Sequence, residues 1–193
     1  MRQLLRSIGR LLRPRWFVTN VAALPAPPGE LRVPSGVSVR LGSAADAAAL
    51  TPLVRGRESL AWRFARGDPV LIAELDGRVV GCTWLTSRPL RPSYFPIRVA
   101  PQPGEWYNYG LAVLPAYRGR GLGRLLSRMA IAEAGRRGGR LVFGHASRFN
   151  RNAAASHAAA GFVTVEELIG LTMLDRFAVV LYRRRRVNPR GGG

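Results

Sequence analysis

The chain has 193 residues, 47% of them apolar, which is enough for one domain with a full core and too few for two. The formal charge is +19, but every Lys or Arg position is an arginine, as in GC-rich coding, and the arginines are spread along the chain, so we do not expect nucleic acid as a partner. One cysteine, Cys82, excludes an internal disulfide and a cysteine-based metal site, and no apolar run reaches the roughly 18 residues of a membrane span, so we expect a cytoplasmic protein without a metal.

Residues 1–13 place leucines and an isoleucine at helical spacing, with arginines on the other faces. This pattern predicts a basic amphipathic helix that ends before Pro14. Such a helix either docks on its own domain or makes peripheral contact with an anionic membrane or an acidic acyl carrier protein. Residues 23–34 are rich in proline, which favours neither a helix nor a central strand. We therefore expect residues 1–36 to lie outside the domain.

The first part of the domain alternates apolar and polar residues in short stretches. Ser43 and Asp46 have the spacing of a helix capping box, and Asp76-Gly77 suits a two-residue hairpin turn. The predicted elements are a strand at 38–41, helices at 43–55 and 57–66, two hairpin strands within 69–87 and a long loop at 89–104.

The second part begins with a strand that leads into a cluster of glycines. The predicted elements are a strand at 105–114, a glycine-rich turn at 117–124, a helix at 122–139, a strand at 140–146, a helix at 150–161 and two strands at 162–169 and 177–184. This order predicts one α/β domain over residues 37–183, with a largely antiparallel sheet. A basic, disordered tail is expected at 184–193.

The glycine-rich turn, YRGRGLGR at residues 117–124, predicts an anion site. A helix that begins after such a turn presents unpaired N–H groups and the positive end of its dipole, and the arginines add charge. A Walker loop would need a lysine, which the chain lacks. A dinucleotide fingerprint needs G-x-G-x-x-G, whereas the spacing here is G-x-G-x-G. Neither kind of nucleotide site is therefore expected.

The stretch from Leu111 to Arg124 resembles the acyl-CoA signature of the GNAT superfamily of N-acyltransferases. That signature, Gln/Arg-x-x-Gly-x-Gly/Ala, follows a strand ending in a pattern like L-x-V-x-P, and here the chain reads LAVLPAYRGRGLG. Arg118, Gly121 and Gly123 occupy the signature positions. A second family pattern, N-x-x-A-x-x-x-Y-x-x-x-G-F, is matched in spacing by Asn150, Ala153, His157, Gly161 and Phe162.

The resemblance covers roughly residues 37–182 and implies a GNAT-like α/β fold, a central, mostly antiparallel sheet with helices on both faces. It implies that two parallel strands, 105–114 and 140–146, splay apart to bind acyl-CoA, most simply acetyl-CoA. The pyrophosphate would lie on the amides of the turn, and a β-bulge near Gly110 would free strand N–H groups, one of them an oxyanion donor. The implied CoA-binding residues are Leu111, Ala112, Val113, Arg118, Gly119, Arg120, Gly121, Leu122, Gly123, Arg124 and Asn150.

Transfer from a thioester to an amine needs a neutral amine and a proton for the departing thiolate, and both tasks suit histidine. His157 takes the place of a family tyrosine that protonates the thiolate, and the alternative is that it only packs. His145 lies five residues before Asn150, where some relatives carry a glutamate that deprotonates the amine, and the alternative is a hydrogen-bonded core histidine. Further candidate bases or substrate contacts on the preceding strand are Glu105, Tyr107 and Tyr109.

We therefore expect an acyl-CoA-dependent N-acyltransferase that transfers an acetyl group to the primary amine of a small molecule or peptide, by direct attack in a ternary complex. Two alternatives stay open. One is a longer acyl group delivered by CoA or acyl carrier protein, and the other is a non-catalytic basic module that binds membrane or nucleic acid. Acceptor specificity is expected from the first two helices, the last strands and the loop at 87–104, with Tyr94, Phe95 and Trp106 as substrate contacts.

Overall fold

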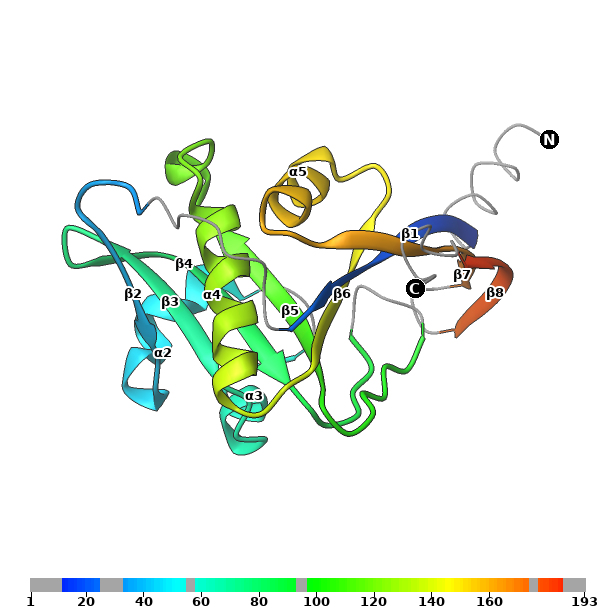
Figure 1. Ribbon diagram of the computed structural model, residues 1–193, viewed down its shortest axis with the longest axis horizontal. Coiled ribbons are helices and arrows are strands. Elements are labelled where there is room, and N and C mark those ends of the chain that lie inside the picture. Colours follow the sequence, from blue (N-terminus) through cyan, green and yellow to red (C-terminus); the bar gives the residue numbers. More distant parts are fainter. Residues whose placement is uncertain (1–11, 25–32, 55–57, 93–96, 174–176, 186–193) are drawn as a thin grey trace.

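The structure, a computed structural model, describes residues 12–24, 33–54, 58–92, 97–173 and 177–185. Within these ranges the chain forms an eight-stranded sheet in the order β2-β3-β4-β5-β6-β1-β7-β8 (Figure 1). The strands are β1 (Leu12–Ala23), β2 (Val37–Leu41), β3 (Val70–Leu75), β4 (Arg78–Thr86), β5 (Glu105–Val113), β6 (Leu141–Ser147), β7 (Val163–Met173) and β8 (Phe177–Arg185). The helices are α2 (Ala47–Leu50), α3 (Leu60–Ala65), α4 (Leu122–Arg136) and α5 (Arg151–Ala159), with 3₁₀ turns at Ala44–Asp46, Thr51–Leu53 and Pro115–Tyr117.

Every neighbouring pair of strands is antiparallel except β5 and β6, which run parallel. These two strands pair only over Glu105–Tyr107 and Leu141–Phe143. Beyond that point β5 continues to Val113 and β6 to Ser147 without further pairing between them. The mixed α/β fold and the splayed parallel pair expected from the sequence are confirmed.

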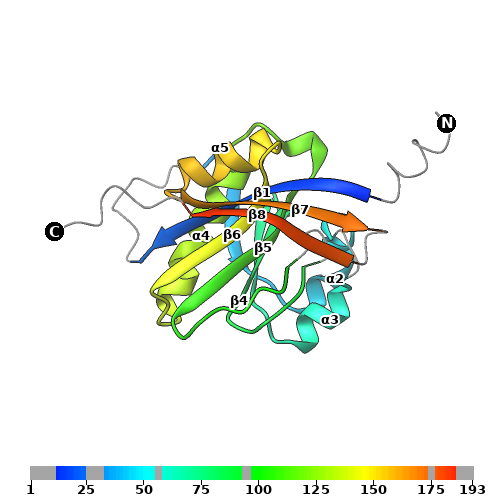
Figure 2. The same cartoon turned by 90° about the vertical axis from the view of Figure 1, so that its right-hand side faces the viewer.

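Helices cover both faces of the sheet, with α4 and α5 on one face and α2 and α3 on the other (Figure 2). Helix α4 is amphipathic as predicted, and its Leu122, Leu126 and Ile131 are buried in the apolar cluster on its face. The other face has a second cluster that contains Trp84 and Tyr107, both fully buried. Each large apolar side chain contributes about 1.5–3 kcal/mol by leaving water, so both faces stabilise the sheet.

Strand β1 lies between β6 and β7, whereas the sequence analysis placed residues 1–36 outside the domain. It pairs with both neighbours, over Phe17–Ala23 with β6 and Leu12–Val21 with β7. The physical reason lies in the stretch WFVTNVAA, whose aromatic and β-branched residues favour a strand. Phe17 and Val18 are buried, so this strand is part of the folded domain.

Two predicted segments fall largely outside the described residues. Of the helix predicted at 1–13, only residues 12 and 13 are described, and they belong to β1. Of the tail predicted at 184–193, only residues 184 and 185 are described, and they belong to β8.

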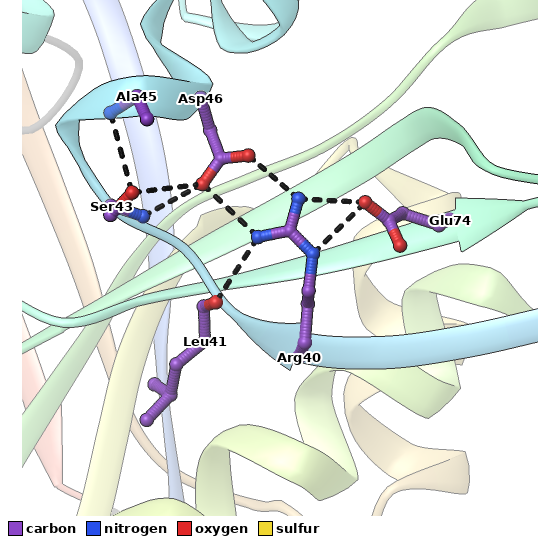
Figure 3. A network of polar contacts seen from close by, with 6 residues as sticks. All are labelled: Arg40, Leu41, Ser43, Ala45, Asp46 and Glu74. Carbon is purple, nitrogen blue, oxygen red and sulfur yellow. Dashed lines mark hydrogen bonds and ion pairs between the residues drawn. The ribbon is translucent and has the colours of Figure 1, made fainter.

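The predicted capping box holds the turn after β2 (Figure 3). Ser43 Oγ accepts the N–H of Ala45, and the Asp46 carboxylate accepts the N–H of Ser43 at 2.8 Å. The Arg40 guanidinium donates to Asp46 at 2.6 Å and to Glu74 of β3 at 2.7 Å. These contacts, the Arg40 hydrogen bond above all, lower the pKa of Asp46 to about 2. The network therefore ties the first helical segment to β2 and β3.

The other local predictions are confirmed in type and differ in extent. The β3–β4 hairpin turns at Asp76 and Gly77, with φ values of 50° and 76°, as a type I′ turn requires. The first predicted helix is a four-residue helix between two 3₁₀ turns, and it ends at Leu53. Helix α3 begins at Leu60, where Ser59 caps it by accepting the N–H of Trp62.

Candidate functional site

A β-bulge interrupts the pairing of β4 with β5 just beyond the last β5–β6 pair. Cys82 is paired with Ala112 and Trp84 with Tyr109, so β5 has one extra residue in this stretch. Gly110 lies there with φ +63°, a conformation that favours glycine. The predicted bulge is confirmed. It lies where β5 has lost its partner on the β6 side, so strand backbone is left for a ligand.

The glycine-rich turn after β5 leaves the N-terminus of α4 open. Gly119 and Gly121 have φ values of 77° and 78°, and a Cβ at either position would meet nothing within 4 Å. Gly121 is the N-cap of α4 and supplies no side-chain cap, and the first turn holds no acidic residue. The first N–H groups of the helix are therefore left for a ligand or solvent at the positive end of the dipole. This arrangement fits a phosphate group.

Three exposed arginines surround the turn and add positive charge. Arg118 Nε donates to the backbone oxygen of Val113 at 3.2 Å. The guanidinium of Arg120 lies over the ring of Tyr117, 5.6 Å from its centre. Arg124 is in the first turn of α4. Their exposure leaves all three accessible to an anion on the turn.

The second family pattern lies on α5 and the loop before it. Asn150 is the N-cap of α5, and its Oδ1 accepts the N–H of Ala153 at 3.0 Å. A contact of Asn150 with CoA stays a prediction. Gly123 on α4 lets the two helices approach closely, because a Cβ there would lie 2.8 Å from Ser156 Oγ of α5.

His157 is a buried residue on α5, 6% exposed, and its hydrogen bond comes from β1. Its Nδ1 accepts the Asn20 amide at 3.1 Å, and Asn20 Oδ1 accepts the Thr164 hydroxyl at 2.8 Å. This bond places the ring proton on Nε2. Burial lowers the pKa of His157, so its imidazole is neutral at pH 7. The ring packs on Phe162 and lies against β6, with Cε1 3.8 Å from the position of a Cβ at Gly144.

A cavity of about 600 Å³ lies on the opposite face of the sheet, over β6, β1 and β7. Residues 97–100 contribute to its wall, so the loop at 87–104 reaches the cavity as expected for an acceptor site. Its polar lining residues are Thr19, Arg98, Gln102, Glu105, His145 and Glu166. A cavity of this volume with a few polar groups is typical of a small-molecule site.

His145 lines this cavity close to the opening between the strands. It is half-buried and lies two residues beyond Phe143, the last residue of β6 that pairs with β5. Its Nδ1 lies 3.3 Å from the Tyr107 hydroxyl oxygen. Glu105 also lines the cavity, but at the paired end of the strands, where its carboxylate accepts the N–H of Gln102 at 2.9 Å. His145 is therefore the better placed of the two for chemistry at the opening.

Tyr109 is a buried hydrogen-bond donor. Its hydroxyl donates to Asp68 at 2.9 Å, and Asp68 also accepts from Arg66 Nε at 2.7 Å. Burial, together with the Asp68 carboxylate, raises the pKa of Tyr109 above its ordinary value. With a raised pKa, the Tyr109 hydroxyl stays protonated at neutral pH and donates a hydrogen bond to Asp68. This state argues against Tyr109 as a base.

Trp106 lies on the α4 face of the sheet, away from the cavity. A Cβ at Gly139 would lie 2.7 Å from its ring, and Arg137 lies over the ring at 5.9 Å. Its alternation with Tyr107 along β5 puts it on the face opposite that residue, so the expected acceptor contact is not supported. Tyr94 and Phe95 lie outside the described residues.

Some polar residues reach the site from elements that the sequence did not connect with it. Asn20 of β1 binds His157, and Thr19 donates to Glu166 at 3.0 Å at the cavity. In the sequence, the only indication of a role for Thr19 and Asn20 is that they form a polar pair inside an apolar stretch. Arg63 on α3, 2% exposed, was also missed, because nothing distinguishes one arginine in a chain this rich in arginine.

A splayed parallel pair, a bulge beside it and an open glycine turn at the next helix define the class of acyltransferases that use acyl-CoA. The chain belongs to the acetyltransferase (GNAT) family, whose sequence profile matches residues 47–162. None of the curated proteins compared with the chain matches it.

Solved structures agree on the fold. A GCN5-related N-acetyltransferase from Sphaerobacter thermophilus has a TM-score of 0.63 at 20% identity, over 89% of this chain and 55% of that protein. Another from Kribbella flavida has a TM-score of 0.59 at 16% identity, over 89% of this chain and 63% of that protein. The structure of yncA from Salmonella typhimurium with its cofactor acetyl-CoA has a TM-score of 0.56 at 22% identity, over 82% and 100%. The chain thus spans only part of the first two proteins, and at these identities the likeness shows the fold alone.

No helix in the described ranges combines the length and apolarity that a bilayer crossing needs. The described residues also bring together no group of three or more His, Cys, Asp or Glu side chains that could hold a metal ion.

Proposed function

We propose that this GNAT-family protein transfers an acetyl group from acetyl-CoA to a primary amine, by direct attack of the amine in a ternary complex. The observation that carries this proposal is the opening between β5 and β6. The strands pair for three residues each and then separate beside the bulge at Gly110. The cavity lies on one face of this region, and the open turn at 119–121 follows β5.

Acetyl-CoA supplies the acyl group as an activated thioester. The turn and the first amides of α4 would hold its pyrophosphate, and the β5 backbone at 111–113 would pair with its pantetheine arm. The cradle fits this ligand because nothing lies within 4 Å of a Cβ at Gly119 or Gly121. The yncA structure, which has the same fold, contains acetyl-CoA, and this supports the assignment.

The acceptor amine would reach the thioester from the cavity. His145 is the base in this proposal, since it lines the cavity at the opening and can take a proton from an ammonium group. Direct attack is favoured over an acyl-enzyme because the one cysteine is unsuited to nucleophilic attack. Cys82 is buried, and burial raises its pKa to about 12.

His157 would act on the side of the departing thiolate. Its imidazole is neutral and holds its proton on Nε2, because burial lowers its pKa and Asn20 donates to Nδ1. A neutral imidazole is a weak acid but a good hydrogen-bond donor. We therefore propose that His157 stabilises the thiolate by a hydrogen bond, and that the thiolate takes its proton from elsewhere.

Calorimetry with acetyl-CoA tests the cradle. Wild-type protein should bind it, and Gly121→Val should bind at least about tenfold more weakly, because a β-branched side chain disfavours the φ of 78° at the head of the cradle. An amine library screened by release of free thiol then tests transfer, with longer acyl-CoAs and acyl carrier protein as alternative donors. A folded wild-type protein that does not bind acetyl-CoA would contradict the proposal.

A further inference from the structure

Arg63 is a cation enclosed by the protein and only weakly paired among the described residues. It lies on α3, 2% exposed, and its guanidinium carbon is 5.2 Å from the ring centres of both Trp84 and Tyr109. Among the carboxylates of the described residues, the one paired with it is that of Glu58, whose Oε2 lies 3.9 Å from Nη2. Among the described residues, neither Nε nor Nη1 has a hydrogen-bond partner, although both atoms are buried.

Such an arrangement destabilises the folded protein. Burying a charge costs several kcal/mol unless it is paired and hydrogen-bonded, and the two aromatic contacts return only about 0.5–2 kcal/mol each. A methionine would fill the same space between Trp84 and Tyr109 without this cost. The arginine is therefore better explained by negative charge that arises nearby than by packing.

The position of the guanidinium indicates where that charge arises. A Cβ at Gly110 would lie 2.6 Å from Nη1 of Arg63, so the guanidinium rests directly against the backbone of the bulge. Gly110 itself is only half-buried. The cation therefore lies behind the β5 segment that faces the opening between β5 and β6, on the same face of the sheet as the cavity.

We propose that Arg63 is a positioning residue that strengthens the oxyanion site of the acyl transfer by polarising the peptide groups of the bulge. This rests on the proposed function, in which the thioester lies at this bulge. The amine lone pair forms a bond to the thioester carbon, and the carbonyl π electrons move to oxygen, which becomes negative. When the intermediate collapses, an electron pair on the oxygen re-forms the C=O bond, the C–S bond breaks and its electron pair leaves with the CoA sulfur, and the amine proton passes to the base.

Charge on the carbonyl oxygen rises only during this step. Arg63 should therefore stabilise the transition state and not the bound ground state, so its loss lowers kcat and leaves the affinity for acetyl-CoA unchanged. Loss of a merely structural arginine would lower stability without lowering kcat selectively. The decisive readout is therefore whether kcat falls while Kd for acetyl-CoA stays the same.

The test compares Arg63→Met, Arg63→Lys and the matched control Arg66→Met with wild type. Arg66 is on the same helix end and also stacks on an aromatic ring, but its charge is paired with Asp68 at 2.7 Å. The probe is acetyl-CoA, with turnover followed as free thiol, both without an acceptor and with an amine found in the library screen. Binding is measured by calorimetry, and folding by circular dichroism.

We expect Arg63→Met to lower turnover about 10²-fold, the typical loss for one oxyanion-stabilising group, with Kd for acetyl-CoA within about threefold of wild type. Arg63→Lys keeps the charge and should retain at least a tenth of the wild-type rate, and it carries the test if Arg63→Met does not fold. Arg66→Met should stay within about threefold of wild type.

Four results overturn the proposal. Folded Arg63→Met that turns over at the wild-type rate contradicts the role of Arg63 alone. A rate in Arg63→Lys as low as that of buffer, or a loss of acetyl-CoA affinity in Arg63→Met equal to the loss of rate, shows that the charge does not act on the transition state. Wild-type protein that binds acetyl-CoA but never releases thiol contradicts the acyl-transfer function, and the role of Arg63 with it.

Discussion

Replacing Asn20 with leucine tests whether β1 lies inside the sheet, as in the structure, or outside the domain, as the sequence indicates. Asn20 is 4% exposed and joins three elements, since its amide donates to His157 of α5 at 3.1 Å and its oxygen accepts from Thr164 of β7 at 2.8 Å. Leucine has the same number of side-chain heavy atoms in the same branched arrangement and can make neither bond. If β1 lay outside the domain, the substitution would change almost nothing.

The loss can be estimated bond by bond. His157 Nδ1 is buried and would be left without a donor, which costs about 1–3 kcal/mol. The Thr164 hydroxyl belongs to a half-buried residue that water can partly reach, so its loss is nearer 0.5–1.5 kcal/mol. We therefore expect the free energy of unfolding to fall by about 2–4 kcal/mol, and Tm by about 5–10 °C for a domain of this size.

Urea and thermal unfolding of wild type and Asn20→Leu measure this difference, and Asn152→Ala on the exposed side of α5 is the matched control. The control should stay within about 0.5 kcal/mol of wild type. Nitrogen NMR adds a second readout, because His157 should hold its proton on Nε2 in wild type and lose that preference in the variant. A loss of stability no larger than that of the control would refute the placement of β1 beside α5.

Three further predictions concern proton transfer and pH. His145→Ala should lower turnover by about 10²-fold or more with Kd for acetyl-CoA unchanged, and an unchanged rate between about pH 6 and 9 would remove His145 from the mechanism. Burial lowers the pKa of His157 in the folded state, so the unfolded chain binds more protons, and wild-type stability should fall as pH drops below about 6.5. Urea midpoints at about pH 7.5 and 5.5 measure this decline, which His157→Phe should lack. The pKa of Asp46 is about 2 in the fold against 3.8 unperturbed, so its contribution is complete above 3.8 and is lost as pH falls towards 2. Because Arg40 is 43% exposed, screening leaves that contribution near 1 kcal/mol, and the difference between the urea midpoints of wild type and Asp46→Asn should be smaller at about pH 3 than at about pH 6.

The elements that the sequence predicts well are those whose causes lie within a few residues. The periodic leucines of α4 show which face is buried, and the glycines at 119 and 121 supply the positive φ that the turn requires. The β3–β4 hairpin is likewise decided by Asp76 and Gly77. In each case the determining contacts are local, so a single stretch of sequence carries the information.

Strand β1 is different because its place depends on distant partners. Phe17 pairs with Ser147 on one side and Leu168 on the other, both more than a hundred residues away. No periodicity in the first residues shows that β6 and β7 leave a place between them. The helical spacing of the leucines and arginines just before it pointed to another structure, and the proline-rich stretch after it hid the connection to the sheet.

The site shows the same limit in its polar residues. A buried polar group is tolerated when it finds a partner, and here the partners come from different elements, as Asn20 with His157 and Thr19 with Glu166. Neither pair is visible until the sheet is assembled. Arg63 stands apart, because assembly buries it and leaves Nε and Nη1 without an acceptor among the residues that the structure describes. A buried arginine held against the bulge at Gly110 is hard to explain by folding, and the proposed stabilisation of a short-lived negative charge gives it a reason to be there.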